Sequence, residues 1–102
     1  MIGDPGVETK EQRRTRRAEL TKQVMADLMR LRLFERRFQQ TTIARESGIS
    51  RSHFRALLRG EKQMSLFIFL ELSQALGFDD AGQLMRQVHQ RVRDIVEGVV
   101  KQ

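Results

Sequence analysis

Residues 40–60 read QTTIARESGISRSHFRALLRG, and this stretch places small and apolar residues at the spacing that two short crossed helices need. Ile43 and Ala44 close the first helix over the second, and Ala44 must be small because the second helix crosses there. Gly48 takes the left-handed backbone of the turn without a Cβ penalty. Ser50 is a good N-cap for the second helix. The stretch therefore predicts two short helices joined by a turn.

The second of these helices has two faces of different chemistry. Its apolar face carries Phe54, Leu57 and Leu58 at the i, i+3, i+4 spacing of a buried stripe. The opposite face is short, basic and mostly slim, as a helix must be to enter a DNA major groove. That face carries Arg51, Ser52, Arg55, Ala56 and Arg59. We interpret it as a DNA-reading surface, and the alternative is a solvated basic helix face.

The same register resembles a known family. The Cro-like, or XRE, repressor helix-turn-helix family is matched at Gln40, Ile43, Ala44, Gly48, Ile49, Phe54, Leu57 and Gly60. Residues 65–78, SLFIFLELSQALGF, look like that family's following helix. The resemblance implies an all-α, five-helix lambda-repressor-like helix-turn-helix domain. By matching positions it also implies DNA base contacts from Arg51, Ser52, Arg55 and Ala56, and a phosphate contact from Gln40.

The side chains at these positions have the chemistry that the implied contacts require. Arg51 and Arg55 lie one turn apart, and either can donate two hydrogen bonds to guanine O6 and N7. Ala56 can touch a thymine methyl group. Lys and Arg side chains around the helix can meet phosphates, which set the register on DNA. The further predicted phosphate contacts are Arg59, Lys62, Arg36 and Arg37.

Composition narrows the function classes further. A chain of 102 residues with no cysteine suits one cytoplasmic domain without disulfides or thiol chemistry. Residues 10–37 carry a net charge of +6 and residues 38–70 a net charge of +3, whereas residues 71–102 carry −1. Two distant histidines and the lack of a Gly-rich phosphate loop argue against a metal site, a cofactor or an enzyme. The basic charge lies on and before the helix-turn-helix, as double-stranded DNA would require.

The chain divides into three predicted parts. Residues 1–8, which hold the only proline, are predicted to be a disordered tail. Residues 9–78 form the predicted DNA-binding domain, whose basic first helix begins with a Thr9 and Gln12 capping box and stops near Arg36. Residues 79–102 form a predicted C-terminal dimerisation helix, opened by Asp80 and Gln83. The run RRTRR at residues 13–17 is either an arm that follows DNA or a solvated helix end.

Apolar residues in the C-terminal helix follow a heptad spacing, starting at Ala81. A compact core covers only the first half of such a helix, so a second chain is expected to cover the rest. The predicted dimer contacts are Met85, Val88, Val92, Ile95, Val96 and Val99. The alternative is that this helix folds back on Leu20, Val24 and Leu28 of its own chain.

Together these features predict a sequence-specific transcriptional regulator that binds double-stranded DNA as a homodimer, most simply an autoregulating repressor. A rival hypothesis is the antitoxin of a toxin-antitoxin pair, in which the C-terminal helix covers a small toxin. A third hypothesis keeps the fold but loses sequence specificity, which would make the protein an architectural DNA binder.

Overall fold

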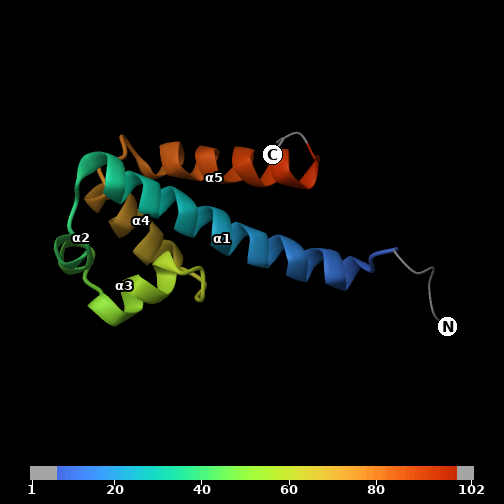
Figure 1. Cartoon of the computed structure of the whole chain (residues 1–102), viewed down its shortest axis with the longest axis horizontal. Coiled ribbons are helices and arrows are strands. Elements are labelled where there is room, and N and C mark those ends of the chain that lie inside the picture. Colours follow the sequence, from blue (N-terminus) through green and yellow to red (C-terminus); the bar gives the residue numbers. More distant parts are fainter. Residues whose placement is uncertain (1–6, 99–102) are drawn as a thin grey trace.

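Five helices make up the fold in the computed structural model, which describes residues 7–98. They are α1 (Lys10–Arg36), α2 (Gln40–Glu46), α3 (Arg51–Leu58), α4 (Leu66–Ala75) and α5 (Ala81–Val96), and no strand occurs in this range. Figure 1 shows α5 on one side of the long α1, and α2, α3 and α4 on the other. The all-α prediction is confirmed. Most of the tail predicted over residues 1–8 lies outside the described residues.

Both ends of α1 follow the predicted signals. The Thr9 side chain accepts a hydrogen bond from the Gln12 backbone N–H at 3.0 Å, and Gln12 Oε1 accepts one from the Thr9 N–H at 2.9 Å. This reciprocal pair is the predicted capping box. The helix ends at Arg36, and Arg37 follows with a left-handed φ of 56°. The predicted start and stop of this helix are therefore confirmed.

The turn between α2 and α3 depends on one glycine. Gly48 has a φ of +74°, and a Cβ at this position would meet nothing within 4 Å. Glycine is therefore needed for its backbone conformation and not for space. After the turn, Ser50 caps α3 by accepting a hydrogen bond from the His53 N–H at 3.0 Å. Ile43, on α2, is buried as predicted.

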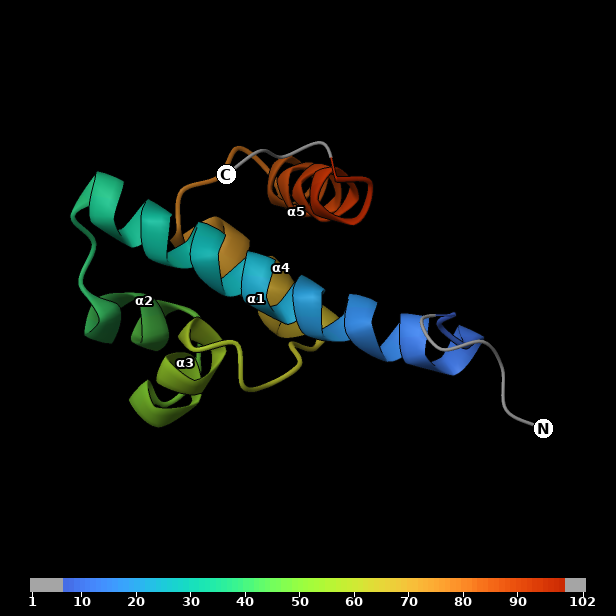
Figure 2. The ribbon, with the colours of Figure 1, turned by 45° about the vertical axis from the view of Figure 1, so that its right-hand side comes forward.

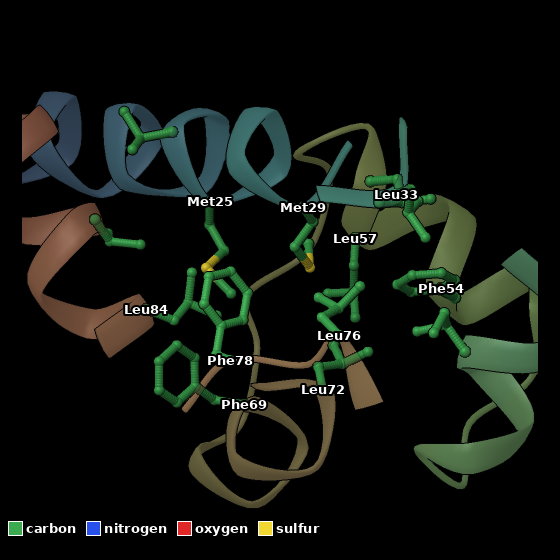
Figure 3. Packing of buried hydrophobic residues seen from close by; sticks show 14 of the residues in the cluster. Met25, Met29, Leu33, Phe54, Leu57, Phe69, Leu72, Leu76, Phe78 and Leu84 are labelled. Atoms are coloured by element: carbon green, nitrogen blue, oxygen red, sulfur yellow. The ribbon is translucent and has the colours of Figure 1, made fainter. Parts of the chain in front are cut away.

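Every helix contributes to one hydrophobic cluster. Its members include Met25 from α1, Ile43 from α2, Phe54 from α3, Leu72 from α4 and Leu84 from α5. Figure 3 shows side chains of α1 meeting those of α3, α4 and α5 in this cluster. The short helices α2 and α3 thus have fixed positions relative to α1, because their apolar faces are part of the shared core.

Arg32 joins α1 to the end of α4. Its Nε donates a hydrogen bond to the Leu76 carbonyl at 2.9 Å, and its Nη2 donates one to the Gly77 carbonyl at 2.6 Å. The guanidinium also lies 4.1 Å from the centre of the Phe78 ring. These carbonyls have no partner within the helix, so a charged donor stabilises the helix end. Arg32 therefore fixes the point where the chain leaves α4 for α5.

The helix α5 packs along α1 of its own chain, in the opposite direction (Figure 1). Val88 and Val92 are buried in the cluster, and Val92 is only 9% exposed. The prediction that these two valines form a dimer interface was wrong, because α1 already covers them. Leu20 packs against the same cluster, as the fold-back alternative required. Val96 is half-buried and packs against the cluster as well.

Two residues of the predicted seam are exposed. Met85 is 49% exposed and Ile95 is 42% exposed. Val99, the last predicted dimer contact, lies outside the described residues.

Within residues 7–98, no helix combines the length and apolar character needed to cross a membrane.

Candidate nucleic-acid interface

One face of α3 carries polar side chains that no other part of the fold covers. Arg51, Ser52, Arg55 and Arg59 are all exposed. Their helix is held from behind by its buried apolar face, including Phe54. In both ribbon views α3 lies on the side of α1 opposite α5 (Figures 1 and 2). The structure therefore presents four of the predicted DNA-contacting residues together on an outer surface.

Ala56 does not belong to this face. Ala56 is only 7% exposed, so the prediction that it touches a base was wrong. The helix α3 packs against both α1 and α2, and its buried residues are Phe54, Ala56, Leu57 and Leu58. The buried side of α3 is therefore wider than the predicted stripe and includes Ala56.

A shallow hollow joins α1, α2 and α3 beside the exposed face. It is lined by Arg30, Gln40, Arg55, Leu58 and Arg59. Three of these, Gln40, Arg55 and Arg59, were predicted from the sequence as DNA contacts. The hollow gathers three guanidinium groups and one amide, which are donors that suit phosphate oxygens.

Arg30 is the residue of the hollow that sequence reasoning missed. Its guanidinium donates hydrogen bonds to the Leu58 carbonyl, in the last turn of α3, and to the Asp27 carboxylate on its own helix. The side chain stays about half exposed. Within α1, no spacing distinguishes Arg30 from the other exposed arginines. Its role depends on a contact across 28 residues of chain, which only the fold reveals.

Arg59 is already paired with a carboxylate. Its Nε lies 2.7 Å from Glu61 Oε2, and its Nη2 donates a hydrogen bond to Glu61 Oε1 at 3.2 Å. The hydrogen bonds from Arg59 hold the pKa of Glu61 below its usual range. The pair is therefore intact at neutral pH and is lost only as the pH falls through the pKa of Glu61. A phosphate that binds Arg59 must share or displace this carboxylate.

On the interpretation of this face as a DNA-contacting surface, replacing Glu61 by Gln should strengthen binding to any DNA duplex by about twofold, because Arg59 loses a competing anion. The dependence of affinity on salt should also steepen. Fluorescence anisotropy with a labelled duplex at two salt concentrations measures both effects. Glu46→Gln is a matched control, since Glu46 is exposed on α2 and makes no ion pair within the described part of the chain. If both variants gain the same affinity, the change comes from net charge alone and not from the Arg59–Glu61 pair.

The other predicted phosphate contacts lie elsewhere. A guanidinium nitrogen of Arg36 lies 3.8 Å from where a Cβ on Gly77 would stand, which places it by the end of α4. Arg37 is exposed in the connection between α1 and α2. Lys62 is exposed and lines a separate apolar groove. The structure does not bring these three residues to the hollow beside α3.

The basic run at residues 13–17 is helical. It lies near the N-terminal end of α1, which extends beyond the other helices (Figure 1), and its side chains are exposed. Glu8 binds two of its members, with 2.8 Å to Arg16 and 4.0 Å to Arg13. These contacts agree with the solvated helix end and not with an extended arm.

Among residues 7–98, no three His, Asp or Glu side chains gather closely enough to hold a metal ion. No protein-family model matches the chain, and searches of curated proteins and of solved structures found no match either.

Proposed function

We propose that α2 and α3 form a Cro-like helix-turn-helix and that the chain is a sequence-specific regulator of transcription that binds double-stranded DNA. The main support for this proposal is the exposed face of α3. There, Arg51, Ser52 and Arg55 point away from a helix whose other side is part of the core. A helix held in this way presents its side chains in a fixed register, which base recognition requires.

In the proposed mechanism, some residues fix the position of the protein on the DNA, and others recognise the base sequence. Arg30, Gln40 and Arg59 bind backbone phosphates near the hollow, and their positive charges displace counterions from DNA. With the register set, Arg51 and Arg55 read base edges in the major groove, and guanine is the base that an arginine contacts most often. Bound at a promoter, the protein would repress transcription by occupying the site.

A homodimer remains part of the proposal, since regulators of this type bind two half-sites about 34–36 Å apart. The described part of α5 is a poor interface by itself. Among the predicted seam residues that lie within residues 7–98, only Met85 and Ile95 are exposed, whereas a stable interface uses about 20–30 residues from each partner. A dimer therefore needs a surface beyond this seam.

Selection from a random pool of duplex DNA at physiological salt tests the proposal. A single enriched motif rich in G·C pairs at the positions read by arginine is the expected result, and an inverted repeat would establish the dimer. Binding without any enriched motif would favour the architectural hypothesis. Failure to bind any duplex would remove DNA recognition from the function of this chain.

Arg51→Ala and Arg55→Ala should each weaken binding to the selected duplex by about 1–3 kcal/mol and relax the preference at one base position. Both side chains are exposed, so the free energy of unfolding should stay close to that of the parent. Repeating the selection with each variant measures the loss of preference directly. Arg14→Ala, near the projecting N-terminal end of α1, is the matched control and should leave the selected motif unchanged. If both α3 variants select the parent motif, α3 does not read bases.

A further inference from the structure

A second surface, separate from the α3 face, is an apolar groove of about 290 Å³. It lies between α1, α4 and α5, and the chain that connects α3 to α4 forms part of its wall. Its apolar lining includes Met25, Met64, Leu66, Phe69, Met85 and Val88. The proposed DNA contacts use none of these six side chains.

The groove continues into an exposed apolar surface. Leu66 is 68% exposed and Met85 is 49% exposed, and they come from α4 and α5 respectively. Phe67 and Leu70 extend the exposed apolar area along α4. A contiguous apolar patch with a polar rim marks an interaction site more often than scattered single residues do. Methionines in such a wall adapt to the shape of the group that fills it.

Two lysines lie at the rim of the groove, and one of them is already paired with a carboxylate. Lys22 lies on the α1 side and Lys62 on the side of the connection between α3 and α4. Lys22 Nζ is 2.6 Å from Glu19 Oε2, whereas Lys62 makes no ion pair within residues 7–98. No carboxylate lines the described groove itself. An occupant with acidic groups beside an apolar face would therefore match both parts of the surface.

We propose that this groove binds one face of an acidic amphipathic helix from a partner protein. The apolar residues of such a helix, at i, i+3, i+4 and i+7, would fill the space between Leu66 and Met85. An acidic residue of that helix would face Lys62, the rim lysine that makes no ion pair within residues 7–98.

The open shape of the groove and its charge favour a helix from a partner protein over a small ligand and over a second copy of this chain. Sites that enclose a small ligand usually bury about 70–90% of its surface, whereas this groove is open along one side and exposes Leu66 and Met85. A second copy bound groove to groove would bring the lysines of both copies together, and like charges across an interface oppose association. A separate acidic helix avoids both difficulties.

Two synthetic helical peptides test the proposal. Both carry leucines at i, i+3, i+4 and i+7; one has glutamates at the flanking positions and the other has lysines. Fluorescence anisotropy with the full chain should show that the glutamate peptide binds about tenfold more tightly. The assay contains no DNA, so its result is independent of the α3 face.

Variants at the rim and the wall locate the site. Met85→Asp should weaken binding of the glutamate peptide by about tenfold or more, because it places a charge against the apolar face of the peptide. Lys62→Glu should bring the affinities of the two peptides to within about twofold. Phe34→Asp is the control, since Phe34 is an exposed apolar residue that does not line the groove. Circular dichroism checks that each variant keeps its helices.

Three results would overturn the proposal. The first is equal binding of the two peptides, or binding that Met85→Asp and Phe34→Asp affect alike. The second is displacement of the glutamate peptide by sodium decanoate at concentrations too low for micelles, which would assign the groove to a small amphipathic acid. The third is a doubled mass in light scattering that Met85→Asp abolishes, which would assign the groove to a second copy of the chain.

Discussion

Phe54→Ala should lower the free energy of unfolding by about 3–5 kcal/mol, which is a large part of the stability of a domain of this size. Phe54 is fully buried in the middle of α3, and Figure 3 shows its ring beside Leu33 of α1. Removing the ring leaves a cavity that the neighbouring side chains can fill only in part. The short helix α3 would then lose one of the buried side chains that attach it to the core. Urea unfolding followed by circular dichroism measures the change.

A nearby exposed residue provides the control for this experiment. Ser52 lies on the same helix with its side chain exposed, so Ser52→Ala should change the free energy of unfolding by less than about 0.5 kcal/mol. If Phe54→Ala is as stable as Ser52→Ala, the core does not hold α3 in place. A comparison of Phe54→Ala with Arg55→Ala also separates stability from recognition, because Phe54→Ala would lose the proposed DNA binding through unfolding and Arg55→Ala would lose it while still folded.

Local features of this fold could be predicted from the sequence because each depends on neighbours along the chain. The cap at Ser50 needs only an N–H three residues away, and the turn at Gly48 needs only a backbone that favours positive φ. The buried stripe of α3 needs only the helical period. The same reasoning correctly ended α1 at Arg36.

Features that depend on what covers a surface could not be predicted in this way. Periodicity placed Ala56 on the polar side of α3, but it contains no information about how much of α3 is covered by α1 and α2. Arg30 lies within the hollow only because α1 crosses the end of α3. A helical period fixes which residues share a face, and the tertiary fold decides what meets that face.

The α5 seam shows the same distinction, and it leads to the second large effect. Val92→Asp should lower the free energy of unfolding by about 3 kcal/mol or more, because it buries a carboxylate without a partner between α5 and α1. Val92 is 9% exposed and belongs to the same cluster as Val24 of α1. Ile95, one turn further along α5, is 42% exposed. Ile95→Asp should therefore cost only about 1 kcal/mol.

The two variants distinguish α5 packed on its own α1 from α5 packed on a second chain, because the two arrangements predict opposite results. If α5 packs on its own α1, Val92→Asp unfolds at lower urea than Ile95→Asp, and the mass of the folded protein in light scattering is the same for both variants. If instead Val92 faced a second chain, Val92→Asp would stay folded and its mass would fall to that of a monomer. The buried position of Val92 requires the first result, because a carboxylate there would lose its hydration whenever the chain folds, with or without a second copy.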